Sequence, residues 1–227
     1  MHPHSPVLKK VERKERQRSN WLMTQERRAL AWLCARMPQS ITSNMLTALG
    51  LFGSVILAAT LFLASGERWW LLAGIFGLAV NWLGDSLDGR LAYYRKRPRK
   101  WFGFALDLMV DWASLGLVTL ALAHYLSQFA FIPFVLMAAY GARMLIAAVS
   151  YKITEEYRID SGKVGPTEAR LLMAGAFVLE CFFPASLLWL SGFALLVLLL
   201  VDVLEVINLL KLADTRDRLE RSVGVVS

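Results

Sequence analysis

Four aspartates stand out in this sequence because they lie within apolar segments. Asp85 and Asp88 are three positions apart near the end of one apolar segment, and Asp107 and Asp111 are four positions apart near the start of the next. Residues three or four apart project from one face of a helix, so each pair is expected to share a face. An aspartate at the centre of a bilayer costs on the order of 2.5–3.5 kcal/mol on insertion scales. Carboxylates in such positions therefore need a chemical reason.

A divalent metal site is the reason that these residue types favour. The two segments are joined by a short connection, so they are expected to run antiparallel with both faces at a similar depth below the cytoplasmic surface. Carboxylate oxygens suit Mg²⁺, Mn²⁺ or Ca²⁺, and two such ions would balance four negative charges. Two metals about 3.5–4 Å apart are an arrangement that clamps phosphoryl groups. The alternative is that the aspartates form ion pairs with Arg90, Arg143 or cations of the connecting loops.

Six apolar segments must position these side chains. The chain has 227 residues, of which 56% are hydrophobic and 19% charged, and its mean hydropathy is +0.47. This composition excludes a disordered or fibrous protein, and two cysteines exclude a disulfide framework. Each segment approaches the ~20 residues that cross a bilayer core. The pattern predicts an all-α, polytopic integral membrane protein with six transmembrane helices, over residues 45–64, 69–92, 102–124, 129–150, 167–183 and 186–210. The fifth segment is the weakest candidate for a transmembrane helix, and Pro166 marks its start.

The distribution of Lys and Arg predicts the orientation of the six helices. Basic residues are concentrated before the first helix, at 95–100, at 152–163 and in the C-terminal tail, whereas Arg68 is the single Lys or Arg in the three opposite connections. Short loops rich in Lys and Arg stay in the cytoplasm. We therefore expect both termini to be cytoplasmic. The formal net charge of +7 is explained by this topology, and no nucleic-acid partner is expected because no groove-reading motif accompanies it.

Three regions are expected along the chain. Residues 1–40 form a cytoplasmic N-terminal extension, in which aromatic and aliphatic residues alternate with arginines over 21–37 and favour an amphipathic helix along the inner membrane surface. Pro38 ends this helix. Residues 41–212 form the six-helix transmembrane domain, and residues 213–227 form a cytoplasmic tail. A solvated basic extension is the alternative for the first region.

The aspartates belong to a longer pattern that resembles the signature of the CDP-alcohol phosphatidyltransferase family. Residues 85–92 read DSLDGRLA and residues 103–111 read GFALDLMVD, against the family pattern D-x2-D-G-x2-A-R-x8-G-x3-D-x3-D. Four aspartates, two glycines and one alanine occur in order, and the spacing within each half is kept. Residues 38–47, PQSITSNMLT, are also similar to the segment with which the family begins its first transmembrane helix. The sequence departs from the pattern at Tyr93, where the family has arginine, and by one extra residue between Asp88 and Gly103.

The resemblance implies a reaction and a set of site residues. It implies transfer of a phosphatidyl or similar phospho-alcohol group from a CDP-linked lipid, usually CDP-diacylglycerol, to an acceptor hydroxyl with release of CMP. Two divalent cations, Mg²⁺ or Mn²⁺, and a homodimer are implied as well. The implied metal ligands are Asp85, Asp88, Asp107 and Asp111, with Asp111 also the general base; Gly89, Ala92 and Gly103 would line the nucleotide, and Arg95, or else Arg90, would replace the missing family arginine.

The acceptor side is less determined. Basic residues form a phosphate pocket in family members with phosphorylated polyol acceptors, and the corresponding candidates here are Arg143, Lys163 and Arg170. Arg143 as the partner of an inward-facing aspartate is an equal alternative. A catalytically inactive relative that acts as a lipid-binding or structural subunit is also left open. A cation transporter that uses Asp202 and Glu205 is the leading hypothesis from a different class.

Overall fold

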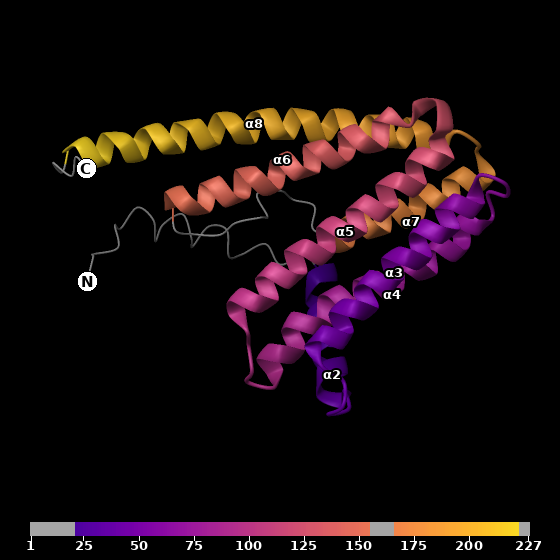
Figure 1. Cartoon of the computed structure of the whole chain (residues 1–227), viewed down its shortest axis with the longest axis horizontal. Helices are drawn as coiled ribbons and strands as arrows, with labels where there is room; N and C mark the ends of the chain where they lie inside the picture. The colour runs from indigo at the N-terminus through magenta and orange to yellow at the C-terminus, as the bar shows by residue number, and fades with distance from the viewer. Residues whose placement is uncertain (1–20, 155–165, 223–227) are drawn as a thin grey trace.

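The computed structural model describes residues 21–154 and 166–222, and every regular element within these ranges is helical (Figure 1). The predicted all-α fold class is confirmed for this part of the chain. The helices in chain order are α2 (Trp21–Arg36), α3 (Ser43–Ala64), α4 (Trp70–Tyr94), α5 (Lys100–Leu126), the 3₁₀ turn η1 (Ser127–Phe129), α6 (Phe131–Thr154), α7 (Pro166–Phe182) and α8 (Ser186–Ser222).

Five helical segments are long and apolar enough to cross a membrane. They cover residues 43–64, 70–94, 101–129, 131–153 and 186–218 and coincide with the first four predicted helices and the sixth. The fifth predicted helix corresponds to α7, which begins at Pro166 as expected but has 17 residues. That length is at the lower limit for a helix that crosses a bilayer. An integral membrane protein is thus confirmed, whereas the sixth crossing stays a prediction.

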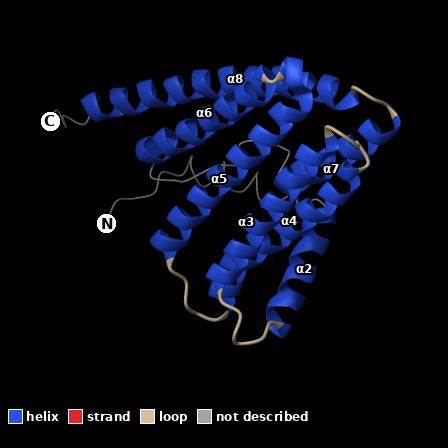
Figure 2. Ribbon diagram, turned by 45° about the vertical axis from the view of Figure 1, so that its right-hand side comes forward, coloured by secondary structure: helices blue, strands red, loops and turns tan. Residues whose placement is uncertain are grey.

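The connections between the helices lie at two ends of the molecule. The links from α3 to α4, from α5 to α6 and from α7 to α8 lie at one end, and the links from α2 to α3 and from α4 to α5 lie at the other (Figure 1). Helices α6 and α8 pack side by side and diverge from the pair formed by α3 and α4, as both views show (Figure 2). Helix α5 lies between these two pairs. The acidic residues of α4 and α5 lie toward the end where these two helices are connected.

Glycine residues allow α3 and α4 to pack with their backbones in contact. A Cβ atom added to Gly53, Gly77 or Gly84 would lie under 3.0 Å from backbone atoms of the facing helix. Small residues at helix interfaces permit such close approach in membrane proteins. We call this contact the glycine seam, and it includes Gly50, whose added Cβ would meet Asp85 N at 3.3 Å. The seam therefore holds the backbone of Asp85 directly against α3.

Glu180 joins three helices at the end remote from the aspartates. Its side chain is 4% exposed and accepts hydrogen bonds from Tyr125 Oη of α5 at 2.9 Å and from Ser186 Oγ at 3.0 Å. It also accepts from the backbone N–H groups of Ala185 at 3.0 Å and Leu187 at 2.6 Å. Leu187 lies in the first turn of α8 and Ala185 directly precedes this helix, where the N–H groups lack partners within the helix. Glu180 thus satisfies a helix end that would otherwise be unpaired.

Helix α2 packs against the ends of α3 and α4 that lie near the aspartates. Leu30 and Cys34 are buried in a cluster with Leu46, Leu87 and Leu91. A helix is present in the predicted region and ends at Arg36, two residues before Pro38, whereas its amphipathic character stays a prediction. Its position along a membrane surface stays a prediction. Thr42 then starts α3 by accepting a hydrogen bond from the Met45 N–H at 3.3 Å, as an N-cap residue does.

Candidate metal centre

The structure brings together three of the four aspartates predicted as metal ligands. Asp85 of α4 and Asp107 and Asp111 of α5 each offer one carboxylate oxygen, and these three oxygens lie within 4.8 Å of one another. Within the described ranges, neither Asp107 nor Asp111 has a hydrogen-bond or ion-pair partner in the protein. Converging carboxylate oxygens, two of them on residues without protein partners, fit Mg²⁺ or Mn²⁺. We refer to these three residues as the acidic cluster.

Asp88 lies beside the acidic cluster and has protein partners of its own. Its Oδ2 accepts a hydrogen bond from Thr47 Oγ1 at 2.6 Å, and its Oδ1 accepts from the backbone N–H of Gly89 at 2.5 Å. Thr47 is buried on α3. Both interactions fix the orientation of the carboxylate, and Asp88 shares a pocket with Asp85 and Asp107. The structure therefore places Asp88 at the edge of the site, oriented by α3.

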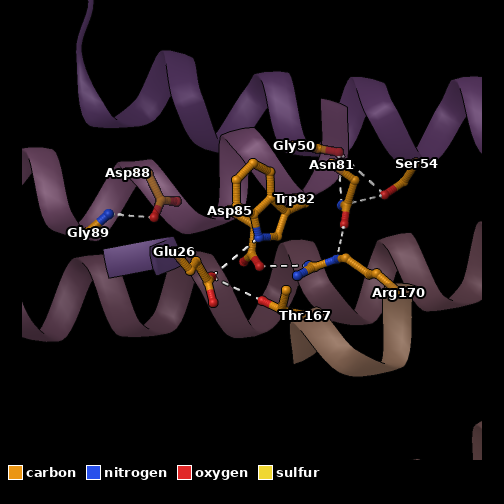
Figure 3. A network of polar contacts seen from close by, with 10 residues as sticks. All are labelled: Glu26, Gly50, Ser54, Asn81, Trp82, Asp85, Asp88, Gly89, Thr167 and Arg170. Carbon is orange, nitrogen blue, oxygen red and sulfur yellow. Dashed lines mark hydrogen bonds and ion pairs between the residues drawn. The ribbon is translucent and has the colours of Figure 1, made fainter. Parts of the chain in front are cut away.

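Asp85 is paired with a cation that comes from α7. The Nη2 atom of Arg170 lies 2.6 Å from Asp85 Oδ2, and the Nε–H of Arg170 donates to Asn81 Oδ1 at 2.9 Å (Figure 3). The Asn81 amide nitrogen donates in turn to the carbonyl of Gly50 at 3.1 Å and to Ser54 Oγ at 3.0 Å. This chain of bonds connects α3, α4 and α7. The ion-pair alternative therefore holds for Asp85, with Arg170 as the partner in place of Arg90 or Arg143.

A second polar contact holds the start of α7 beside α2 and α4. Glu26 of α2 accepts hydrogen bonds from Trp82 Nε1 at 3.3 Å and from Thr167 Oγ1 at 3.0 Å (Figure 3). Thr167 and Arg170 are three positions apart on α7, so they share one face of that helix. One of them contacts α2 and the other contacts α4. The first turn of α7 is thereby fixed next to the acidic cluster.

The end of α4 determines the position of Arg95. Arg97 N–H donates to the Ala92 carbonyl at 2.9 Å and Lys96 N–H donates to the Tyr93 carbonyl at 3.0 Å, with Lys96 at φ 55°. This is the Schellman pattern that terminates many helices, with a left-handed residue just after the helix. The Arg95 guanidinium then donates to the carbonyls of Ile41 at 2.5 Å and Pro38 at 2.7 Å. Arg95 consequently binds the connection between α2 and α3.

A pocket of ≈ 670 Å³ opens beside the acidic cluster. It is lined by residues of α2, α4 and α5: Ala31, Cys34, Asp85, Ser86, Asp88, Gly89, Arg90, Tyr93, Tyr94 and Asp107. Tyr93 is 69% exposed, and within the described part of the chain Arg90 makes no hydrogen bond or ion pair. Burial raises the pKa of the Cys34 thiol despite the lowering effect of Arg90 and Arg95. A thiol with a raised pKa is not a reactive group, so Cys34 contributes packing to this wall.

The glycines of the site differ from those of the seam. A Cβ added to Gly89 or Gly103 would meet no atom within 4 Å, whereas Gly84 is in contact with α3. Packing therefore explains Gly84 and does not explain the other two. Gly89 lines the pocket, and Ala92, predicted on the same side, contributes its carbonyl to the end of α4 and is not one of the pocket's lining residues.

The predicted acceptor residues are found in separate places. Arg170 is bound to Asp85, as described above. Arg143 of α6 lies 3.8 Å from Asp202 of α8, measured from Nε to Oδ1, and Asp202 is 8% exposed. Lys163 lies outside the described residues. Of the two predicted acceptor residues that the structure describes, Arg170 of α7 is thus the one that interacts with the acidic cluster.

Several contributors to the site were not predicted from the sequence as site residues, among them Asn81, Glu26 and Thr47, which orients Asp88. Asn81 is four positions before Asp85 and faces the same side of α4, so a polar residue at that spacing within an apolar segment was an available signal. Glu26 had no comparable signal, because it lies among charged residues on a helix expected at the membrane surface. Its partners come from segments 56 and 141 positions away. Contacts over such separations follow from packing and cannot be found from local patterns.

Comparison with known proteins identifies one family. The family model of CDP-alcohol phosphatidyltransferase matches residues 40–204, a range that contains the acidic cluster, Asp88 and both site glycines. No curated protein and no solved structure gives a significant match.

Proposed function

Because the chain belongs to the CDP-alcohol phosphatidyltransferase family, we propose that it transfers a phosphatidyl group from CDP-diacylglycerol to an acceptor hydroxyl and releases CMP. Family membership supports the type of reaction, a transfer from a CDP-alcohol in phospholipid synthesis, and the donor and acceptor are the proposal. The observation that carries it is the convergence of three carboxylate oxygens within 4.8 Å beside a pocket that has open space at Gly89.

The proposed metal ligands are the acidic cluster and Asp88. Bound divalent ions would supply positive charge that stabilises the developing negative charge on the diphosphate. Asp85 and Asp88 come from the last turns of α4, and Asp107 and Asp111 come from the first turns of α5. Because the aspartates come from both helices, α4 and α5 together line one pocket. Thr47 orients the carboxylate of Asp88.

Asp111 is the proposed general base. Its carboxylate has no partner among the described residues, so an oxygen remains available to accept the proton of the acceptor hydroxyl. The acceptor oxygen forms a bond to the phosphorus that carries diacylglycerol. The bond between that phosphorus and the bridging oxygen breaks, and CMP leaves with the electron pair. The proton ends on Asp111 and the charges balance.

Arg90 is the residue that we propose for the donor phosphates in place of the family arginine. It lines the pocket and has no partner among the described residues, whereas Arg95 is bonded to the backbone carbonyls of the connection between α2 and α3. Tyr93 and Tyr94 add two exposed rings to the same pocket, and aromatic rings stack on nucleobases. The acceptor, a polyol phosphate or another alcohol, is proposed to approach from the side of α6 and α7, where Arg143 and Arg170 lie. We also propose that the protein is a homodimer and that both termini lie in the cytoplasm.

The first test measures CMP release by the purified full chain. CDP-diacylglycerol is supplied with Mg²⁺ or Mn²⁺ and a panel of alcohols, sugar phosphates and amino-alcohols, and wild type is compared with Asp111→Asn. A general base contributes about 10²- to 10⁴-fold, so the variant should lose at least about 100-fold of the acceptor-dependent rate.

Asp214→Asn is the matched control, because it makes the same chemical change on the exposed end of α8. The control should keep the wild-type rate. Acceptor-dependent CMP release at an equal rate in Asp111→Asn would contradict the proposed base. Folded wild-type protein that releases no CMP with any acceptor would favour an inactive relative.

A further inference from the structure

Arg170 brings a fixed positive charge to the acidic cluster. We propose that Arg170 is an internal competitor of the divalent cations, which lowers the metal affinity of the cluster by holding one oxygen of Asp85. The inference rests on the proposed metal centre and concerns a residue of α7, outside the motif that supplies the aspartates. Arg170 Nη2 lies 2.6 Å from Asp85 Oδ2, so the two side chains form a charge-assisted hydrogen bond.

The competing guanidinium is held in place from two sides. Its Nε–H is bonded to Asn81 Oδ1 at 2.9 Å while Nη2 is bonded to Asp85. The Asn81 amide donates both to the Gly50 carbonyl and to Ser54 Oγ, so its oxygen is the atom left to face Arg170. Gly50 belongs to the glycine seam. Arg170 is therefore attached, through Asn81, to the glycine seam (Figure 3).

Electrostatics gives the direction of the effect. A guanidinium on Asp85 offsets one of the three negative charges of the acidic cluster and repels a divalent ion bound to the same carboxylate. The side chains of Arg170 and Asp85 are only 19% and 24% exposed, so solvent screens this repulsion incompletely. The negative diphosphate of a bound donor would counteract the repulsion. In the presence of Arg170, a bound donor therefore increases the affinity for the metal. Linkage makes this effect reciprocal, so a bound metal increases the affinity for the donor by the same factor.

Titration of Mn²⁺ into the purified full chain in detergent, without substrate, tests the proposal. Arg170→Gln should bind Mn²⁺ at least about threefold more tightly than wild type, since a repelling charge is removed from a poorly screened site. Asn81→Leu should change the affinity in the same direction by a smaller factor. In the Arg170→Gln background Asn81→Leu should add nothing, because Asn81 acts through Arg170.

A second titration, with CDP present, separates this role from a structural one. CDP should tighten Mn²⁺ binding more in wild type than in Arg170→Gln. The matched control is Arg218→Gln, which breaks the exposed pair with Asp214 at 2.9 Å and should leave both affinities unchanged.

Each outcome decides the question. Folded Arg170→Gln with unchanged or weaker Mn²⁺ affinity overturns the competitor role while leaving the proposed function intact, provided that wild type binds Mn²⁺. If Arg170→Gln does not fold, the variants Arg170→Lys and Asn81→Leu test the proposal instead. A lysine cannot donate to Asn81 and Asp85 with the fork geometry of a guanidinium, so the Arg170→Lys variant should also bind Mn²⁺ more tightly than wild type. Unchanged affinity in both of these variants overturns the proposal. Wild type without Mn²⁺ binding overturns both the proposal and the metal centre on which it rests.

Discussion

At the residue scale, two arginines five positions apart have different environments. Arg90 lines the pocket, whereas Arg95 joins the end of α4 to the connection between α2 and α3 through the carbonyls of Pro38 and Ile41. Both carry the same charge and both follow the first aspartate pair. Sequence position alone therefore does not distinguish a ligand-binding arginine from a structural one, and their bonds do.

This difference leads to a prediction for donor binding. Arg90→Gln should raise the KM for CDP-diacylglycerol by about tenfold or more, since a hydrogen bond to a charged group contributes about 1.5–3 kcal/mol. Arg95→Gln should lower the unfolding temperature and leave that KM within about twofold of wild type, because its bonds are to the backbone. Steady-state kinetics and thermal unfolding of both variants check this. An increased KM in Arg95→Gln alone would reverse the assignment.

Much of the acidic cluster was predictable from the sequence. Aspartates at three- and four-residue spacing in two apolar segments predicted helix faces that meet, and the structure brings Asp85, Asp107 and Asp111 together. The partner of Asp85 was not predictable in the same way. Arg170 lies 85 positions away in sequence, and only the packing of α7 against α4 places it there. Metal binding by any of the four aspartates stays a prediction.

At the element scale, the glycine seam explains why α3 supports a site made of residues from α4 and α5. Backbone contact at Gly53, Gly77 and Gly84 removes the space that side chains would normally occupy between two helices. Helix α5 packs against another face of α3. Both helices that carry the aspartates are thus positioned by the same neighbour. Sequence patterns predicted the helices and their order, and the interhelical distances show which glycines form the seam.

The seam can be tested with single methyl groups. Gly53→Ala and Gly77→Ala should each destabilise the fold by about 1–3 kcal/mol, because the added carbon meets backbone that cannot move away. Gly175→Ala on α7 is the control, since its added carbon meets nothing within 4 Å. The control should be neutral or stabilising by up to about 1 kcal/mol, as alanine favours a helix over glycine. Unfolding measured in detergent checks the order, and equal stability of all three variants would contradict it.

At the scale of the whole molecule, the helix connections separate into two groups at opposite ends (Figure 1). The connection from α4 to α5 carries several basic residues, whereas the turn from α3 to α4 carries Arg68 alone. The positive-inside rule then predicts which end faces the cytoplasm. The structure agrees with the grouping of the connections, and the orientation itself stays a prediction.

Labelling of single cysteines measures that orientation. Cys34 and Cys181 are both buried and are first replaced by alanine. Gly66→Cys in the turn from α3 to α4 should react with a membrane-impermeant maleimide on intact cells, whereas Arg97→Cys should react only after permeabilisation. Both positions are exposed, so both should react in detergent. Reaction of Arg97→Cys on intact cells would invert the proposed topology.

The glycine seam determines how α3 and α4 respond to bilayers of different thickness. Bilayers of different thickness are accommodated by helix tilt, and tilt changes the register of neighbouring helices when they move separately. Helices α3 and α4 are in backbone contact at several levels, so they must tilt as one unit. Gly50, Asn81 and Asp85 then keep their relative heights in thin and thick membranes alike. Helices α6 and α8 diverge from this pair and carry none of the acidic cluster, so a change in their tilt leaves these three residues in place.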